Sequence, residues 1–379
     1  MRSVSERRII VVQPALPAYR LDFFDRLATS LGPLFRVYAS RSEMSGLSIR
    51  QTPPWLNTLD QMRNPIRGME WQPGAISIAI RRGDILIVCG APRCLSTLAL
   101  MIKARLIGAK TVWWGHYWSA TSIAWRHRFR LLSMRLADAV LFYTDQEVEA
   151  YRQKESRHDG RVISALNNGI NVAPIKPLRL PYDAGMRPNR LLFIGRLTEK
   201  ARLDLLLGAL ADPHLSGVDL QVIGDGPNAA TLKAQADALG LDARVTWHGA
   251  QTDEAQVAAI ANTCRLFVYP GAVGLSLLHA AAYGLPAIVH KDRATHMPEI
   301  AAFEGGRTGG AFSKGVVASL VETITDALSS TQVLNRWSAA AMQKADEEFN
   351  TEQMAARFLT LMAKLAPLPD AKPAEVCNG

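Results

Sequence analysis

The segment that most constrains the fold of this chain is residues 265–290, RLFVYPGAVGLSLLHAAAYGLPAIVH. Residues 265–269 form a short apolar run that predicts a buried strand, and the proline that follows ends it. A glycine-containing loop at 271–274 precedes residues 275–283, whose apolar spacing predicts a helix. Residues 287–290 begin another apolar strand. Strand, loop, helix and strand in this order predict one unit of a parallel α/β sheet.

The loop of this segment is a candidate ligand site. In an open parallel sheet, ligands bind outside the carboxyl ends of the strands. The free N–H groups of residues 274–277 would face an anion such as a diphosphate there, because they begin a helix. An ordinary strand–helix–strand unit with a glycine turn explains the same pattern equally well.

The same alternation of apolar strands and helical segments runs through both halves of the chain. It predicts an α/β fold with parallel sheets. The apolar runs predict strands at residues 8–13, 35–39, 85–89, 111–114, 139–143, 190–195, 220–223 and 245–249. Residues 41–75 are polar, with several prolines and glycines, and predict irregular structure.

The length of 379 residues predicts two or three domains. We expect a first domain at 1–175, a proline-containing linker at 176–189 and a second domain at 190–350. Residues 351–365 predict a last helix, and residues 366–379, which hold three prolines, predict a disordered tail.

The net charge of +9 is distributed unevenly. Residues 1–189 hold 27 Lys and Arg against 14 Asp and Glu, whereas residues 190–379 hold 16 against 20. This asymmetry predicts that the first half meets an anionic surface or substrate, of which an anionic membrane or a lipid pyrophosphate fits best. A basic surface that serves solubility is the alternative. Nucleic acid is not expected as a partner, because no nucleic-acid-binding motif accompanies the charge.

The four cysteines are widely spaced without a Cys-x-x-Cys pair, so they indicate neither a disulfide framework nor a zinc site. No apolar run is as long as a membrane span, and the N-terminus lacks the apolar core of a signal peptide. We therefore expect a cytoplasmic protein.

Further motifs follow predicted strands of the second half. They are Gly195-Arg196-Leu197 and Gly224-Asp225-Gly226-Pro227, at fixed distances before the segment 270–286. Asn168-Gly169-Ile170-Asn171 precedes the linker, and Pro298-Glu299-Ile300 follows the segment. Together these motifs resemble the group 1 glycosyltransferases of family 4, of the type that builds bacterial surface polysaccharides. The likeness extends over most of the second half and is patchy in the first.

The resemblance implies a GT-B architecture, in which two Rossmann-like domains face a cleft and the C-terminal helix returns to the first domain. It implies a retaining transfer of sugar from a nucleotide-sugar donor to a glycan or lipid-linked acceptor, with no cofactor and no metal. The sequence agrees on the metal, because no Asp-x-Asp follows a strand. The implied donor-binding residues are Arg196, Lys200, Gly224, Gly226, Gly274, Leu275, Ser276, His279 and Glu299.

The first half holds the candidates for catalysis and for acceptor binding. His116 follows a predicted strand and Gly115, and by resemblance it is the catalytic histidine that faces the donor sugar. A histidine can donate a hydrogen bond to a hydroxyl or phosphate at neutral pH, but a lone histidine is more often a polar core residue. Tyr19 and Arg20 lie in a Pro-x-Tyr-Arg loop that resembles a subset of polysaccharide transferases. Arg20 fits an acceptor phosphate and fits a solvated helix start equally well.

Two positions depart from the family pattern. The family has glutamates where this chain has Gly271 and His279. These changes favour an alternative function, a GT-B-like protein that binds nucleotide sugars without transferring them. A Rossmann dehydrogenase is a weaker alternative, because Gly-x-Gly-x-x-Gly is missing from the first strand–helix turn.

Residues 124–136, AWRHRFRLLSMRL, predict a cationic amphipathic helix. Such a helix suits the interface of an anionic bilayer. This would place the protein peripherally on the inner face of the cell membrane. A domain helix with its apolar stripe in the core and its arginines in water is equally consistent with the pattern.

Overall fold

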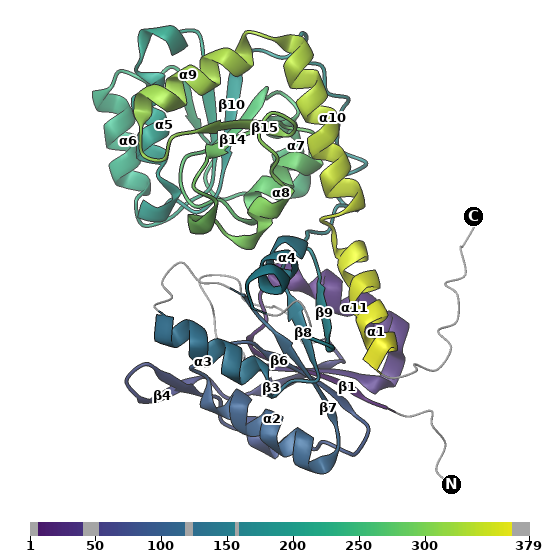
Figure 1. Cartoon of the computed structure of the whole chain (residues 1–379). Coiled ribbons are helices and arrows are strands. Elements are labelled where there is room, and N and C mark those ends of the chain that lie inside the picture. Colours follow the sequence, from purple (N-terminus) through teal and green to yellow (C-terminus); the bar gives the residue numbers. More distant parts are fainter. Residues whose placement is uncertain (1–6, 41–52, 118–123, 156–158, 366–379) are drawn as a thin grey trace, which may run out of the picture. The chain divides into compact units, whose positions relative to one another are not determined.

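The computed structural model describes residues 7–40, 53–117, 124–155 and 159–365, which form two compact α/β units (Figure 1). The first unit combines the described residues up to Leu166 with those from Glu352 onward. The second unit is Asn167–Thr351. The fold class is therefore the predicted one.

The first unit is built on a seven-stranded parallel sheet in the order β3-β2-β1-β6-β7-β8-β9. Ile9 of β1 pairs with Phe35 of β2 on one side and with Ile85 of β6 on the other. The strands of this sheet are β1 Ile9–Ala15, β2 Phe35–Ser40, β3 Leu56–Leu59, β6 Ile85–Cys89, β7 Lys110–Trp114, β8 Ala139–Phe142 and β9 Val162–Ala165. Its helices are α1 Leu21–Leu31, α2 Leu95–Ile107, α3 Ala124–Met134, α4 Asp145–Lys154 and α11 Thr351–Leu365.

Both faces of this sheet are covered, as its continuous apolar strands require. Alternate residues of β1 point to opposite faces, so Val11 packs with α1 and α11 whereas Val12 packs with α2 and α4. The C-terminal helix α11 is fixed by Phe358, whose ring lies edge-on to Phe23 at a centroid distance of 6.0 Å. The last helix therefore belongs to the first unit, next to α1 (Figure 1).

The second unit is a six-stranded parallel sheet in the order β12-β11-β10-β13-β14-β15. Leu191 of β10 pairs with Leu220 of β11 and with Leu266 of β13. The strands are β10 Arg190–Ile194, β11 Asp219–Ile223, β12 Val245–Trp247, β13 Leu266–Tyr269, β14 Ala287–His290 and β15 Gly309–Phe312. The helices are α5 Leu203–Leu210, α6 Ala229–Ala238, α7 Glu254–Ala261, α8 Leu275–Ala282, α9 Val317–Leu328 and α10 Thr331–Glu347.

The boundary between the units follows Leu166, whereas the sequence predicts a first domain up to residue 175 and a linker at 176–189. Residues 167–189 pack on the second unit because Val172 and Ile175 are buried in its core. Arg179 also forms an ion pair with Asp346 of α10 at 2.9 Å. Prolines in this segment therefore mark turns on the surface of a domain and not a free linker.

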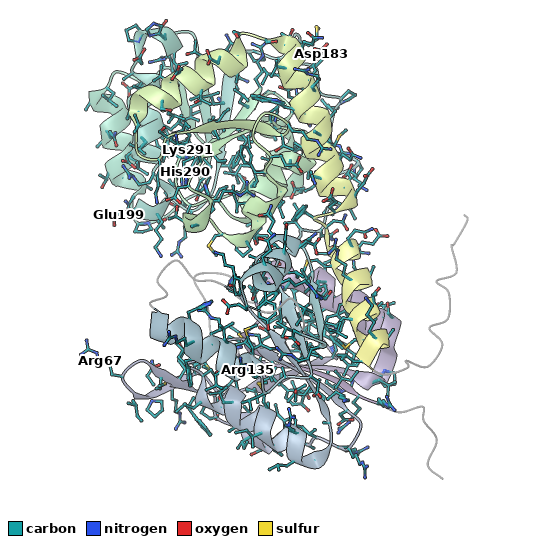
Figure 2. All side chains as sticks on the ribbon, viewed as in Figure 1. Arg67, Arg135, Asp183, Glu199, His290 and Lys291 are labelled. Atoms are coloured by element: carbon teal, nitrogen blue, oxygen red, sulfur yellow. The ribbon has the colours of Figure 1, made fainter. Side chains whose placement is uncertain are left out.

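The polar segment predicted as irregular contains three strands. Besides β3, the strands β4 Arg63–Ile66 and β5 Met69–Trp71 form an antiparallel ribbon. Arg67, at the turn of this ribbon, points away from the unit (Figure 2). Residues 41–52 of the segment and the predicted tail at 366–379 lie outside the described residues. Within the described part of the chain, every helix is too short or too polar to cross a membrane.

Candidate functional site

The loops after β10 and β11 meet at the carboxyl edge of the second sheet. A Cβ atom on Gly224 would overlap the carbonyl oxygen of Gly195, and one on Gly226 would overlap that of Leu197. Gly224 also has a φ of 148°, which L side chains rarely adopt. Glycines stand at these positions because the two loops touch through their backbones.

The loop after β13 is held against the loop after β10 in the same way. A Cβ on Gly271 would overlap the carbonyl oxygen of Lys200, and that oxygen accepts a hydrogen bond from the Ala272 N–H at 3.2 Å. By the resemblance, the family's first glutamate corresponds to Gly271, where the backbone contact leaves no room for any side chain. Two loops touch where the resemblance implies an acidic side chain.

The amino end of α8 opens at this edge. The N–H groups of Gly274, Leu275 and Ser276 have no acceptor among the described residues, as expected at a helix start. The strand order turns between β10 and β13, and such a turning point is where open α/β sheets bind ligands. Arg196 and Lys200, in the adjacent loop after β10, are exposed, and no described residue pairs with either side chain.

His279, on α8, is engaged by a carboxylate that the sequence did not single out. Its Nε2 lies 2.8 Å from Oε1 of Glu254, the first residue of α7. The hydroxyl of Tyr283 donates to the same oxygen at 2.6 Å. Burial raises the pKa of Glu254, but the bonds to His279 and Tyr283 outweigh burial and hold that pKa below its ordinary value. At the position that the resemblance gives to the family's second glutamate, this chain has His279, which is hydrogen-bonded to the carboxylate of Glu254.

Two stacked histidines lie beneath the loop after β13. The Val273 N–H donates to Nδ1 of His296 at 3.1 Å, and Nε2 of His296 donates to the carbonyl of His290 at 2.9 Å. The two rings stack at a centroid distance of 3.8 Å. Burial lowers the pKa of His290 to about 4. His290 and the exposed Lys291 mark the end of β14 (Figure 2).

Glu299 is buried behind the same loop. Nδ2 of Asn168 donates to its Oε1. Its Oε2 lies 3.5 Å from the place that a Cβ on Gly274 would take. Glu299 thus joins the end of the Asn168 segment to the loop before α8 and supports that loop from inside the unit.

In the first unit, Glu147 organises the carboxyl ends of β7 and β8. Its carboxylate is buried and accepts hydrogen bonds from the N–H groups of Tyr117 at 3.1 Å, Tyr143 at 3.0 Å and Thr144 at 3.1 Å. Thr144 and Glu147 also form the capping box that begins α4. Oε1 of Glu147 lies 3.4 Å from Nδ1 of His116.

These contacts orient the imidazole of His116. The ring packs against Tyr143 at a centroid distance of 4.3 Å and an interplanar angle of 32°, and the His116 side chain remains 43% exposed. With Nδ1 facing Glu147, Nε2 is left for a ligand, in the way that a carboxylate commonly fixes a histidine tautomer. His116 therefore lies at the strand end predicted from sequence. The exposed ring argues against the alternative of a polar core residue.

Arg20 follows β1 at the same edge and is buried, which excludes the alternative of a solvated helix start. Its guanidinium lies over the rings of Trp114 at 4.9 Å, Tyr19 at 5.5 Å and Tyr143 at 5.6 Å. Tyr143 thus contacts both Arg20 and His116. In contrast to Arg20, Tyr19 is 37% exposed.

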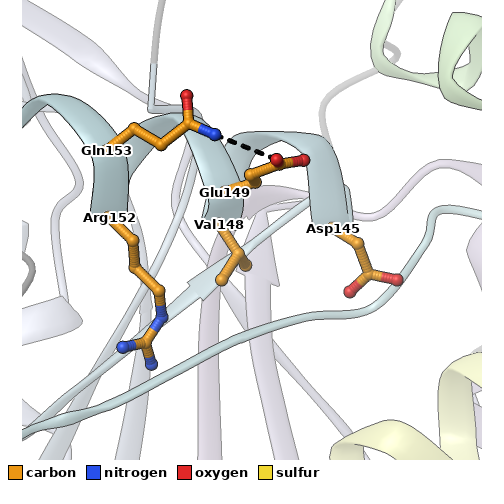
Figure 3. Close-up of a pocket in the computed structure, with 5 residues that line it drawn as sticks. All are labelled: Asp145, Val148, Glu149, Arg152 and Gln153. Carbon is orange, nitrogen blue, oxygen red and sulfur yellow. Dashed lines mark hydrogen bonds between the residues drawn. The ribbon is translucent and has the colours of Figure 1, made fainter.

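The helix α4 also borders a surface hollow of about 470 Å³. Figure 3 shows the side chains that line it, which are Asp145, Val148, Glu149, Arg152 and Gln153. Glu149 accepts a hydrogen bond from Gln153 at 2.9 Å. None of the five belongs to the predicted site, and they carry no arrangement that indicates catalysis.

The predicted site residues therefore fall into two groups, one in each unit. In the second unit, the donor-binding candidates surround the contact of the β10, β11 and β13 loops, with His279 on α8 and Glu299 buried behind. In the first unit, Tyr19, Arg20 and His116 share one sheet edge. The sequence analysis did not single out Glu254 or Glu147, and it included Asn168 only within a motif, without its bond to Glu299. The capping box Thr144-x-x-Glu147 was the sequence pattern that would have indicated Glu147.

Two α/β units that each contain a parallel sheet give the predicted GT-B fold class. Residues 179–344 match the model of the family described as Glycosyl transferases group 1. The lipopolysaccharide 1,6-galactosyltransferase of Salmonella typhimurium is 29% identical over 177 residues, which are 44% of this chain and 48% of that protein. The chain spans about half the length of the curated relatives it matches.

Solved structures show the same fold over nearly the whole chain. The Anabaena protein HepE in complex with UDP has a TM-score of 0.69 at 15% identity, covering 94% of this chain and 100% of that chain. The lipopolysaccharide outer core galactosyltransferase WaaB in its apo form has a TM-score of 0.66 at 16% identity, covering 94% and 99%.

Proposed function

We propose that this chain is a glycosyltransferase that moves a sugar from a nucleotide-sugar donor to a glycan or lipid-linked acceptor in cell-surface polysaccharide biosynthesis. The observation that carries the proposal is the second unit's sheet edge. There the amides of Gly274, Leu275 and Ser276, which have no acceptor within the described ranges, lie near the exposed cations Arg196 and Lys200. The family of residues 179–344, the galactosyltransferase relatives and the UDP complex of HepE support it.

The chemistry follows from charge. Two cations and three backbone N–H groups meet the diphosphate, and they stabilise the negative charge that grows as the bond from the sugar C1 to the diphosphate oxygen breaks. The acceptor hydroxyl oxygen bonds to C1, and its proton leaves to the released diphosphate or to water. These groups neutralise the diphosphate without a metal, so chelation with EDTA should leave the rate unchanged. We further propose that the anomeric configuration is retained.

His116 is the proposed catalytic residue. Glu147 holds Nδ1, so that Nε2 can donate to or accept from a hydroxyl of the donor sugar. We expect His116→Ala to lower turnover while the affinity for the donor stays near that of the wild type. An unchanged turnover number in a folded variant would remove His116 from this role.

The experiment is a panel of nucleotide sugars, screened first by thermal shift and then for release of nucleoside diphosphate with lipopolysaccharide-core and polyprenyl-diphosphate-linked acceptors. One donor should raise the melting temperature and be consumed. A nucleotide sugar that binds but is not consumed with any acceptor would favour the alternative of a binding protein. The replacements at Gly271 and His279 are the sequence features that favour this alternative. A panel in which no nucleotide sugar binds would contradict both functions.

We also propose that the first unit docks on an anionic membrane surface. On α3, Arg128 and the exposed Leu132 face solvent, and Arg135 follows, whereas Met134 packs in the core. Each basic residue near an anionic leaflet contributes about 1 kcal/mol. Co-sedimentation should therefore be stronger with anionic than with neutral vesicles and should weaken with salt and in the Arg128→Gln/Arg135→Gln variant. Equal sedimentation with both vesicle types would exclude this docking.

A further inference from the structure

Arg20 is one of three arginines that are buried among the described residues, and it is the one whose guanidinium has no hydrogen-bond acceptor among them. Arg187 donates to the carbonyl of Cys264 at 2.8 Å, and Arg265 donates to Asn189. Arg20 has no hydrogen-bond acceptor and no ion pair among the described residues, and its Nη1 is fully buried without a partner. A buried charge without a partner is strongly unfavourable, so such a group usually marks a place where a ligand completes the pairing.

The aromatic surroundings hold the cation but leave its hydrogen bonds unmade. Trp114, Tyr19 and Tyr143 present their rings to the guanidinium at centroid distances between 4.9 and 5.6 Å. The attraction of a cation to ring faces accounts for its orientation. Rings accept no strong N–H hydrogen bonds, whereas a guanidinium carries five donors in a planar fork that matches an oxyanion.

The position of Arg20 in the sheet also fits a ligand site. It follows β1, and the strand order of the first sheet turns between β1 and β6. Ligands bind outside the carboxyl ends of parallel strands at such a turning point. His116, just after β7, packs at a tilt against the same Tyr143 ring that Arg20 contacts. At the end of β6, burial raises the pKa of the Cys89 thiol to about 12, and the charge of Arg20 acts in the opposite direction.

We propose that Arg20, together with His116 on the other side of the shared contact with Tyr143, binds an oxyanion carried by the acceptor. The group is a phosphate ester or the carboxylate of an acidic sugar, because both offer two coplanar or clustered oxygens to the guanidinium fork. This inference rests on the proposed function, since it assigns the chemical class of the acceptor. It makes Arg20 a specificity-determining residue that selects acceptors with a negative group next to the reacting hydroxyl.

The test is an NMR titration of the arginine Nε–Hε signals of the full chain. The signal of Arg20 is assigned by its loss in Arg20→Gln and in Arg20→Lys, so that one folded variant suffices. Arg26 provides the matched control, since it lies on α1 close in sequence and is paired with Asp22 at 2.8 Å on the surface. The probes are inorganic phosphate, glucuronate and, as the neutral control, glucose.

We expect phosphate or glucuronate to shift the Arg20 signal saturably while the Arg26 signal and the glucose titration stay flat. A shift with phosphate alone assigns a phosphate ester, a shift with glucuronate alone assigns an acidic sugar, and a shift with both supports an oxyanion of either kind. Arg20→Gln should weaken the binding of the active probe about tenfold or more, the effect of one charge-assisted contact. If neither anion moves the Arg20 signal more than the Arg26 signal, the proposal is overturned.

The titration uses neither a donor nor turnover, so its result is separate from that of the proposed function. UDP added to the same sample reports on the second unit through the Arg196 signal. If the Arg196 signal responds to UDP but the Arg20 signal responds to neither anion, the proposed glycosyltransferase function remains and its acceptor is uncharged. A response at Arg20 without donor binding would leave an anion site in a chain that transfers no sugar.

Discussion

The carboxyl edges of the two sheets differ, because backbone groups form the edge in the second unit and side chains form it in the first. In the second unit, the glycines at 224, 226 and 271 let three loops touch, and the amino end of α8 presents backbone N–H donors beside them. In the first unit, the edge is made by side chains, with Glu147 orienting His116 and three rings surrounding Arg20. A site made of backbone survives replacement of its side chains. This difference explains how the second unit accommodates Gly271 and His279 at positions that are acidic in the family.

The largest effect should come from filling the contact between the second unit's loops. Gly224→Ala places a Cβ onto the carbonyl of Gly195 at a φ that alanine disfavours. We expect the free energy of unfolding to fall by about 3 kcal/mol. Urea denaturation measures it, with Gly217→Ala as the control because a Cβ there meets open space. Equal stability of the two variants would show that the loops are not in backbone contact.

A smaller loss is expected from the side-chain network of the first unit. Glu147→Gln replaces one acceptor oxygen by an NH2 group, so either the N–H of Tyr117 or the N–H groups of Tyr143 and Thr144 lose their acceptor. The free energy of unfolding should fall by about 2 kcal/mol. Glu149→Gln on the same helix is the control, since Glu149 is bonded only at the surface to Gln153 (Figure 3).

A loss confined to Glu147→Gln would confirm that a buried carboxylate organises the first unit's edge. If the two substitutions have the same small effect, the edge is held by the backbone in both units, and the comparison fails.

The stacked histidines predict a pH dependence that belongs to the second unit. His290 is neutral in the folded chain, with a pKa lowered to about 4 by burial, whereas an unfolded histidine has a pKa of about 6.5. As the pH falls below about 6.5, His290 binds a proton in the unfolded chain but not in the folded chain. Stability is therefore present above about pH 6.5 and is lost toward pH 4, at roughly 1 kcal/mol per pH unit.

Urea denaturation from pH 7 to pH 5 measures this slope. His290→Phe keeps a ring against His296 and should make the slope shallower, although His296, whose pKa is also lowered by burial, keeps part of it. His214→Gln at an exposed position should leave the slope unchanged. A slope that is the same in His290→Phe and wild type would assign the pH dependence to other groups.

The positions of β10 to β14 and of the glycine turns in the second unit were accessible from sequence, because buried strands are continuous apolar runs and each touching loop needs a glycine. The strand order and β15 were not predicted. The packing of residues 167–189 was not, because their prolines hide the burial of Val172 and Ile175. The ribbon β4–β5 was missed because β4 is wholly exposed, so no apolar alternation marks it.

The side-chain partners at the sites were beyond the sequence for a different reason. Glu254 pairs with His279, which is 25 residues away in the sequence, and Glu147 pairs with His116, which is 31 residues away. Apolar periodicity predicts each helix or strand separately and does not indicate which side chains of different elements form a pair. For Arg20, the sequence left two interpretations equal until burial excluded one of them.

The central claim is that the second unit binds the diphosphate of a nucleotide sugar, and calorimetry with UDP, GDP and ADP tests it most directly. At least one should bind the wild type. Arg196→Ala should weaken that binding about tenfold or more, the effect of one lost charge-assisted contact. Arg202→Gln should leave it unchanged, because Arg202 is already paired with Asp204 at 3.1 Å. Affinity that is the same in Arg196→Ala and wild type, or no binding of any of the three, would contradict the account.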